Sequence, residues 1–218
     1  MDCHHNHDSG DEPNHDPQFL NAKKQALSSV DRSIAGQIDE PIVELVKFIN
    51  SNRNYYTTSS CSGRVIVSGT QKMASSTTIK EGRDWLFVSH GPEIENGEQF
   101  ARTIVESALE KELDSATLKF EPLILHIRAQ SIDSASQLVR LAVQSGLRES
   151  GMIISTKGRS TVAVRSNNRI EMPLIIQGRL IINQDQLIQL VPIINEKFRN
   201  NRDAIERFES TLVESFKE

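Results

Sequence analysis

The residues best suited to chemistry lie in one run, TTSSCSGR, which spans residues 57–64. Glycine lets the backbone approach a ligand, hydroxyl groups and amides donate hydrogen bonds, and a guanidinium pairs with a carboxylate or phosphate through two parallel bonds. The run therefore predicts a polar ligand site. Its candidate binding residues are Ser59, Ser60, Cys61, Ser62, Gly63 and Arg64. The alternative is a serine-rich hairpin turn with a half-buried cysteine.

Cys61 also raises the hypothesis of nucleophilic catalysis, which requires a nearby base and a lowered thiol pKa. Outside residues 1–18 the only histidines are His90 and His126, so few partners are available. No local signature of a papain-like or caspase-like protease surrounds Cys61. We therefore expect no cysteine hydrolase. A lone histidine such as His126 is more commonly a polar residue whose hydrogen bonds are satisfied on a sheet face.

Two polar residues upstream of this run break a local rule. Asp31 and Ser33 fall in the last turn of a predicted helix, where the helix dipole disfavours an acid. Such a residue points mildly to function, so both are candidate site residues. Asp39 needs no such explanation, because it can cap the helix that follows.

The charge is divided unevenly along the chain. The formal net charge is −4, but residues 1–18 hold five acids and no Lys or Arg, which leaves 25 basic and 24 acidic residues in the remainder. Residues 128–169 hold seven basic residues against two acids. This stretch predicts a patch that faces phosphate groups, and a solvated arginine-rich face is the alternative.

Residues 1–18 are acidic, rich in histidine and almost free of apolar residues, which predicts a disordered tail before a domain over residues 19–218. The histidines of the tail and Cys3 do not have the spacing of a closed zinc site, so we expect no metal. Two cysteines in the whole chain indicate a reducing, cytoplasmic setting. No stretch approaches the roughly 20 apolar residues of a membrane span.

Apolar spacing predicts alternating helices and strands. Helices are predicted near residues 20–34, 42–49, 100–112, 134–145 and 187–212. Strands are predicted near residues 55–58, 65–67, 85–88, 117–128, 152–155, 161–165 and 172–182, with a surface loop over residues 70–84. Pro192 marks either a kink in the long C-terminal helix or its true beginning.

These elements predict an α+β domain with one strongly curved sheet rather than a doubly wound fold. The strands on either side of residues 59–64 predict a hairpin, with the polar run in its turn. A similar KGR turn at residues 157–159 indicates an internal duplication, with its break near residues 113–116. The sequence has no Gly-x-Gly and no P-loop, which excludes the Gly-rich loops that bind nucleotides in many enzymes.

The order of the motifs resembles the wybutosine-synthesis tRNA methyltransferase family, in particular its N4-methylating enzyme. The similarity covers about residues 19–212. Its pieces are Asp31-x-Ser33 with Gly36 and Asp39, the TTSSCSGR run, Trp85 with His90, LKFEPLILHI at 118–127, SGLRESGM at 145–152, AVRS at 163–166 and Pro173. This chain differs in its acidic N-terminal extension and in lacking the charged tail that some relatives carry after the last helix.

The resemblance implies methylation, with S-adenosylmethionine, of a ring nitrogen in the 7-aminocarboxypropyl-demethylwyosine precursor, just 3′ of the anticodon of phenylalanine tRNA. Members of the family use this donor without a Gly-rich loop, and their fold is a barrel-like curved sheet with flanking helices. A non-catalytic RNA-binding or assembly protein of the same pathway is the alternative.

The resemblance also suggests roles for individual residues. Asp31 or His126 would accept the proton, and Arg64 would bind the carboxylate of the precursor's side chain or of the donor. Ser33 and the polar run would line the substrate or cofactor site, while Trp85, Tyr55 or Tyr56 would stack on the splayed base. The residues expected to contact tRNA are Lys157, Arg159, Arg165 and Arg169.

Overall fold

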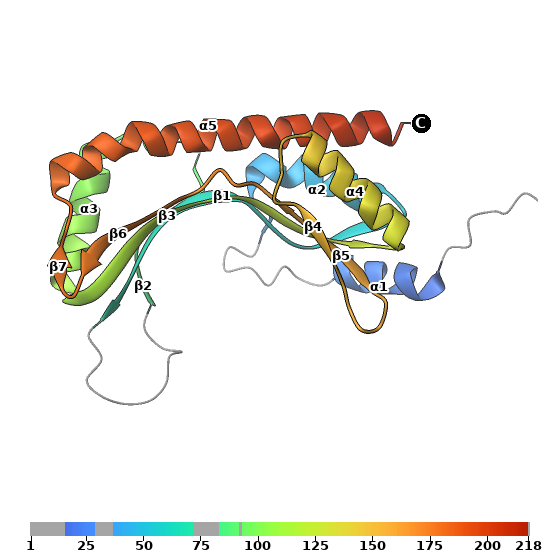
Figure 1. The fold of residues 1–218 in the computed structure, drawn as a ribbon, viewed down its shortest axis with the longest axis horizontal. Helices are drawn as coiled ribbons and strands as arrows, with labels where there is room; N and C mark the ends of the chain where they lie inside the picture. The colour runs from blue at the N-terminus through green and yellow to red at the C-terminus, as the bar shows by residue number, and fades with distance from the viewer. Residues whose placement is uncertain (1–15, 29–36, 72–82, 92, 218) are drawn as a thin grey trace, which may run out of the picture.

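The computed structural model describes residues 16–28, 37–71, 83–91 and 93–217 and forms a curved antiparallel sheet with helices packed on it (Figure 1). The helices are α1 (Pro17–Ser28), η1 (Glu40–Ile42), α2 (Val43–Ser51), α3 (Gly97–Glu110), α4 (Ile132–Gln144) and α5 (Gln184–Ser215). The strands are β1 (Tyr55–Gln71), β2 (Arg83–Ser89), β3 (Leu113–Ala129), β4 (Gly151–Ile154), β5 (Ser160–Arg165), β6 (Ile170–Ile176) and β7 (Arg179–Leu180).

The sheet is built around two long strands, β1 and β3, which pair along most of their 17 residues each. Its order is β2-β1-β3-β5-β4, and β6 also pairs with β3 and carries β7. Helices α2, α3, α4 and α5 lie on one side of the sheet, and α1 lies on the other side near one end (Figure 1). The α+β class and the curved sheet are confirmed. The sheet is open and does not close into the expected barrel.

In the middle of the sheet, near residues 121–123 of β3 and the facing part of β1, the outer strands do not pair with the two long strands. We call this region the waist. β6 pairs with β3 over Ala116–Phe120 and β5 pairs with it over Ile124–Ala129, so residues 121–123 face neither strand. On the other side, β2 pairs with β1 only from Val65 onward. One buried core lies on each side of the waist, and α5 contributes to both. The halves therefore meet in the middle of β1 and β3, not at the predicted break near residues 113–116.

The alternation of buried and outward-facing side chains shifts at this waist. In β3 the buried positions switch from Leu118 and Phe120 to Leu123 and Leu125, so the alternation slips by one residue. Pro122, which has no N–H to donate to a neighbouring strand, lies at the slip and opposite Gly63 of β1. Gly63 has a φ of +112°, a value that other residues rarely adopt.

Asn201 of α5 bridges β1 and β3 at the waist, where the alternation of buried side chains shifts. Its Nδ2 donates to the Ser62 carbonyl at 2.7 Å, and its Oδ1 accepts from the Leu123 N–H at 2.8 Å. A Cβ on Gly63 would lie 2.8 Å from this Nδ2, so glycine is required by space as well as by φ. The buried amide therefore satisfies backbone groups at the centre of the sheet.

The predicted hairpin at residues 59–64 is wrong, because the polar run lies inside the continuous strand β1. The register of β1 against β3 shifts between Thr57 and Ser59, so the small polar residues mark a bulge and a bend rather than a reversal of the chain. The predicted turn at residues 157–159 is confirmed between β4 and β5, where Gly158 has a φ of +72°. The two motifs therefore lie in different structures, which removes the argument for duplication from similar turns.

The expected long C-terminal helix is confirmed as α5. Asn183 and Gln186 form a capping box at its beginning, and Pro192 lies inside the helix rather than at its start. α1 begins at Pro17, before the predicted boundary at residue 19, while residues 1–15 of the predicted tail lie outside the described residues. None of the described helices combines the length and apolarity needed to cross a membrane.

Candidate active site

A cavity of about 670 Å³ lies on the helix-covered side of the waist, next to α5 and η1. Its walls combine apolar side chains with acids, and Arg202 is the one Lys or Arg among the described residues that line it. The lining residues are Gln37, Ile38, Asp39, Glu40, Pro41, Ser62, Gly63, His90, Gly91, Phe198, Asn201, Arg202, Ile205, Glu206 and Glu209. We call this space the acidic cavity.

Asp39 and Ser62 form the polar floor of the acidic cavity. Asp39 Oδ2 accepts a 2.7 Å hydrogen bond from the Ser62 N–H and makes no capping bond to the helix that follows, so the predicted cap is wrong. The Ser62 side chain is buried, and its Oγ has no hydrogen-bond partner in the described structure. A buried hydroxyl without a partner is costly, which suggests that a ligand supplies the partner.

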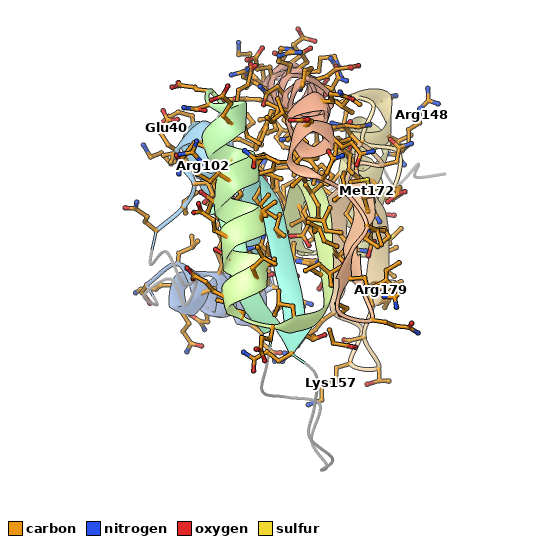
Figure 2. The ribbon with its side chains drawn as sticks, turned by 90° about the vertical axis from the view of Figure 1, so that its left-hand side faces the viewer. Glu40, Arg102, Arg148, Lys157, Met172 and Arg179 are labelled. Carbon is orange, nitrogen blue, oxygen red and sulfur yellow. The ribbon has the colours of Figure 1, made fainter. Side chains whose placement is uncertain are left out.

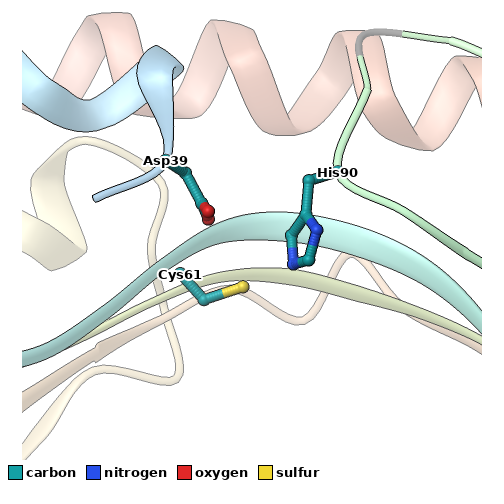
Figure 3. A group of neighbouring side chains, drawn as sticks. All are labelled: Asp39, Cys61 and His90. Carbon is teal, nitrogen blue, oxygen red and sulfur yellow. The ribbon is translucent and has the colours of Figure 1, made fainter. Parts of the chain in front are cut away.

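Asp39, Cys61 and His90 converge at the edge of β1 that β2 leaves unpaired (Figure 3). A carboxylate oxygen, the Cys61 Sγ and an imidazole nitrogen all lie within 4.8 Å of one another. His90 reaches this point because β2 ends at Ser89, opposite Val65. Oxygen, sulfur and nitrogen are also the atoms that bind zinc, so this cluster is where the described residues could hold a metal.

The thiol of Cys61 has a histidine nearby, but it lacks the lowered pKa of a nucleophile. Burial is the largest effect and raises its pKa, a hydrogen bond with the Gly63 backbone opposes this, and the smaller effects of Asp39, Arg64 and Glu121 alternate in sign. A thiol with a raised pKa stays protonated at neutral pH, and the thiolate is the reactive form.

A second cavity, of about 420 Å³, is lined by strands and by the connection between β5 and β6. We call it the basic cavity, because four cations line it: Arg64, Lys119, Arg165 and Arg169. Arg64 donates from Nε to Glu121 at 2.8 Å, and its guanidinium lies 5.4 Å from the ring centroid of Trp85. Trp85 is 43% exposed, so its ring also offers a surface to a ligand. Cys61 lines this cavity too.

His126 lies beside the basic cavity in a chain of polar contacts. Its Nδ1 lies 2.8 Å from Ser59 Oγ, and its Nε2 lies 3.4 Å from Nη2 of Arg165. Burial lowers the pKa of His126, and the positive charge of Arg165 lowers it further. The imidazole is therefore neutral at pH 7, with its free lone pair turned toward a cation.

The structure brings most of the predicted site residues to the waist. Ser62 and Gly63 line the acidic cavity, while Cys61, Arg64, Arg165 and Arg169 line the basic one. Ser59 contacts His126, Trp85 contacts Arg64, and Ser60 is half-buried opposite Leu125 of β3. Asp31 and Ser33 lie outside the described residues.

Other predicted residues lie elsewhere. Tyr55 and Tyr56 are only 1% and 7% exposed, so the expected stacking of a base on them is wrong. Lys157 and Arg159 are exposed on the β4–β5 connection, and Lys157 lies on the opposite side of the molecule from α5 (Figure 2). Sequence reasoning did not select Asp39 or His90. The pairing of His90 with Trp85 in one motif was the available signal.

Comparison with known proteins gives one consistent result. The sequence model of Methyltransferase TYW3 matches residues 21–214. The tRNA wybutosine-synthesizing protein 3 homolog of Homo sapiens is 35% identical over 89% of this chain and 72% of its own length. The tRNA(Phe) 7-((3-amino-3-carboxypropyl)-4-demethylwyosine(37)-N(4))-methyltransferase 1 of Pyrococcus horikoshii is 30% identical over 89% of this chain and 94% of its own.

A solved structure agrees with the sequence comparison. The PH1069 protein from Pyrococcus horikoshii superposes with a TM-score of 0.72 and 29% identity, over 89% of this chain and 95% of that protein. The match to the family model, over residues 21–214, includes the strands of the waist and nearly all of the long helix that bridges them. The chain therefore belongs to the TYW3 methyltransferase family.

Proposed function

We propose that this enzyme methylates a ring nitrogen of the wybutosine precursor in phenylalanine tRNA, at the guanosine-derived position 3′ of the anticodon, with S-adenosylmethionine as donor. Membership of a methyltransferase family supports the reaction class. The name of the Pyrococcus relative supports the acceptor, which is N4 of a demethylwyosine that carries a 3-amino-3-carboxypropyl group.

The acidic cavity is our candidate for the donor site. S-adenosylmethionine supplies, when bound, a methyl group already activated by a sulfonium. The buried Ser62 Oγ lacks a partner and can bond a polar group of a ligand. Carboxylates of Asp39, Glu206 and Glu209 suit the amino group, the ribose hydroxyls and the positive charge of such a molecule. Apolar walls such as Phe198 exclude water from the reacting centre.

The basic cavity and the open side of the sheet are our candidate for the acceptor. Its cations suit an anionic nucleotide, and the exposed ring of Trp85 suits stacking on a splayed base. Arg165 and Arg169 line the cavity itself, while Lys157 and Arg159 would contact phosphates farther along the tRNA.

The reaction must also dispose of one proton. As the new N–C bond forms and the donor's C–S bond breaks, the ring nitrogen loses its hydrogen, so a base must take it. His126 is a weak candidate, because its free lone pair is turned toward Arg165. The imidazole of His90 lies within 4.8 Å of the Asp39 carboxylate, which can orient the ring by accepting a hydrogen bond from it. We therefore assign the proton to His90, with Asp39 as its positioning residue.

One observation supports placing the donor and the acceptor in these two cavities. Cys61 lines the basic cavity, yet its Sγ lies within 4.8 Å of ligand atoms of Asp39 and His90, which line the acidic one. The two cavities therefore adjoin at this edge of β1. Transfer requires the donor's methyl carbon and the ring nitrogen of the nucleobase to be about 3–3.5 Å apart. A donor in one cavity and a nucleobase in the other can come this close only where the two cavities adjoin.

Calorimetric titration of the purified chain with S-adenosylmethionine tests the donor site. Ser62→Ala should weaken donor binding several-fold without loss of thermal stability, because the hydroxyl has no partner in the protein. Ser145→Ala is the matched control. That hydroxyl is also buried but bonds Leu141 and Thr211, so its loss should lower stability by about 1–2 kcal/mol and leave donor binding unchanged.

The same titration separates the alternative function. A chain that binds phenylalanine tRNA but shows no heat of donor binding, with or without the tRNA, would be a non-catalytic RNA-binding protein. Donor binding that Ser62→Ala leaves intact would move the donor out of the acidic cavity while keeping the reaction class.

A further inference from the structure

One of the four cations that line the basic cavity has no carboxylate partner among the described residues. Three of the four cations pair with carboxylates: Arg64 with Glu121 at 2.8 Å, Lys119 with Glu171 at 2.7 Å, and Arg169 with Glu149. Arg165 has no carboxylate partner among the described residues. Its Nε is also shielded from solvent and lacks a hydrogen-bond partner there.

Such an arrangement is costly unless a ligand completes it. Arg165 as a whole is half-buried, but its Nε is shielded from solvent, and a shielded donor without an acceptor loses hydration that nothing in the protein replaces. Exposed cations on a solvated face do not meet this penalty, so the unpaired state of Arg165 is the unusual one. It indicates that an anion belongs beside this guanidinium.

The neighbours of Arg165 position it without neutralising it. The imidazole of His126 contacts Nη2 and is itself held by Ser59. The backbone N–H of Arg165 donates to Ser150 Oγ at 3.0 Å, and β5 pairs this residue with Ile124 of β3. Strand pairing and Ser150 therefore fix the backbone of Arg165, His126 contacts one end of its guanidinium, and the remaining donors have no partner among the described residues.

We infer that Arg165 binds the carboxylate of the amino-acid side chain on the tRNA precursor, a role that the sequence had suggested for Arg64. The inference rests on the proposed function. A guanidinium and a carboxylate match in a planar, two-bond geometry. Arg64 already donates its Nε to Glu121 and lies over Trp85, so its charge is paired in the protein and that of Arg165 is not.

The cavity suits an amino acid better than a phosphate. An α-amino acid group carries an ammonium beside its carboxylate, and Glu121 and Glu171 place acidic oxygens in the same cavity as Arg165. These two acids pair with Arg64 and Lys119, so an ammonium would share carboxylates that already bind cations, whereas a phosphate has no positive group for them to contact. The mixed lining therefore selects a zwitterionic group of the kind that a 3-amino-3-carboxypropyl chain presents.

Two tRNA substrates test the inference. One carries the precursor with its 3-amino-3-carboxypropyl group, and the other carries the same tricyclic base without it. Arg165→Lys keeps the charge but loses the planar fork. It should lower kcat/KM between about tenfold and a hundredfold on the first tRNA and leave it unchanged on the second. Arg102→Lys, an exposed arginine on α3, is the control and should change neither rate.

Each outcome decides the matter. An equal penalty on both tRNAs, or no penalty on either, would overturn the inference, because a residue that only braces the fold does not distinguish them. The same selective penalty in Arg102→Lys would also overturn it. A wild-type chain that methylates neither tRNA would refute the proposed function instead, so the two failures are distinguishable.

Discussion

Cys61 shows how one residue type supports opposite hypotheses until its neighbours are known. Its thiol lies between two cavities, where burial and nearby carboxylates raise its pKa. Cys61→Ser should therefore retain methyl transfer to within about tenfold, a change of roughly 1.4 kcal/mol in the barrier. A steady-state assay on precursor tRNA measures this. Loss of several orders of magnitude would make the sulfur essential, either as a nucleophile or as a metal ligand.

The individual residues of the site were only partly predictable. The polar run was recognisable because it places hydroxyls, a thiol, a glycine and an arginine within eight residues, 57–64. Asp39 was not, because a helix cap one residue away explained it, whereas its actual partner is the N–H of Ser62 on another element. A cap on the next helix was enough to explain Asp39 from the sequence, whereas its observed hydrogen bond joins residues that are 23 positions apart.

At the level of elements, periodicity predicted the helices well and misjudged the central strand. Helices α4 and α5 bury regular apolar stripes, so their spacing alone identified them. The polar stretch of β1 has no such stripe. It lies at the waist, where β2 does not pair and the strand borders two cavities, so its side chains are not required to be apolar.

Asn201 is the contact between elements that holds this waist. Asn201→Leu has nearly the same volume but leaves the Ser62 carbonyl and the Leu123 N–H without their side-chain partner. Each buried group should cost about 1–3 kcal/mol, so the free energy of unfolding in urea should fall by at least about 2 kcal/mol. Asn200→Leu, exposed on the same helix, is the control. Equal effects would show that the amide does not hold the two strands.

At the scale of the whole molecule, the two sides of the sheet differ in charge. Acids line the cavity beside α5, while cations line the cavity among the strands. The sequence already indicated a basic stretch at residues 128–169. It could not reveal the division between two sides, because the acidic lining comes from segments far apart in the chain. The open sheet in place of a barrel has the same origin, since closure depends on strand pairing.

Reversing the charges of Lys157, Arg159 and Arg169 tests whether this side binds tRNA. Affinity should fall, and the slope of log K against log salt should become shallower by about 0.7 to 0.9 for each phosphate that the variant no longer neutralises. Donor binding should be unchanged, because the acidic cavity uses none of these residues. Filter binding over a range of salt concentrations measures the slope. An unaltered slope would place the tRNA on another surface.

The central claim is that methyl transfer occurs where the two cavities adjoin, with His90 as the proton acceptor. The most direct test incubates the purified chain with S-adenosylmethionine labelled in its methyl group and with phenylalanine tRNA that carries the demethylated precursor. We predict that the label appears on the modified base with the wild-type chain. His90→Asn should slow transfer by about 10² to 10⁴ at saturating donor, a loss that any weaker donor binding by this cavity variant does not explain. His126→Asn should lose much less activity. Transfer that His90→Asn leaves at the wild-type rate, or no transfer by the wild-type chain despite tRNA binding, would contradict the account.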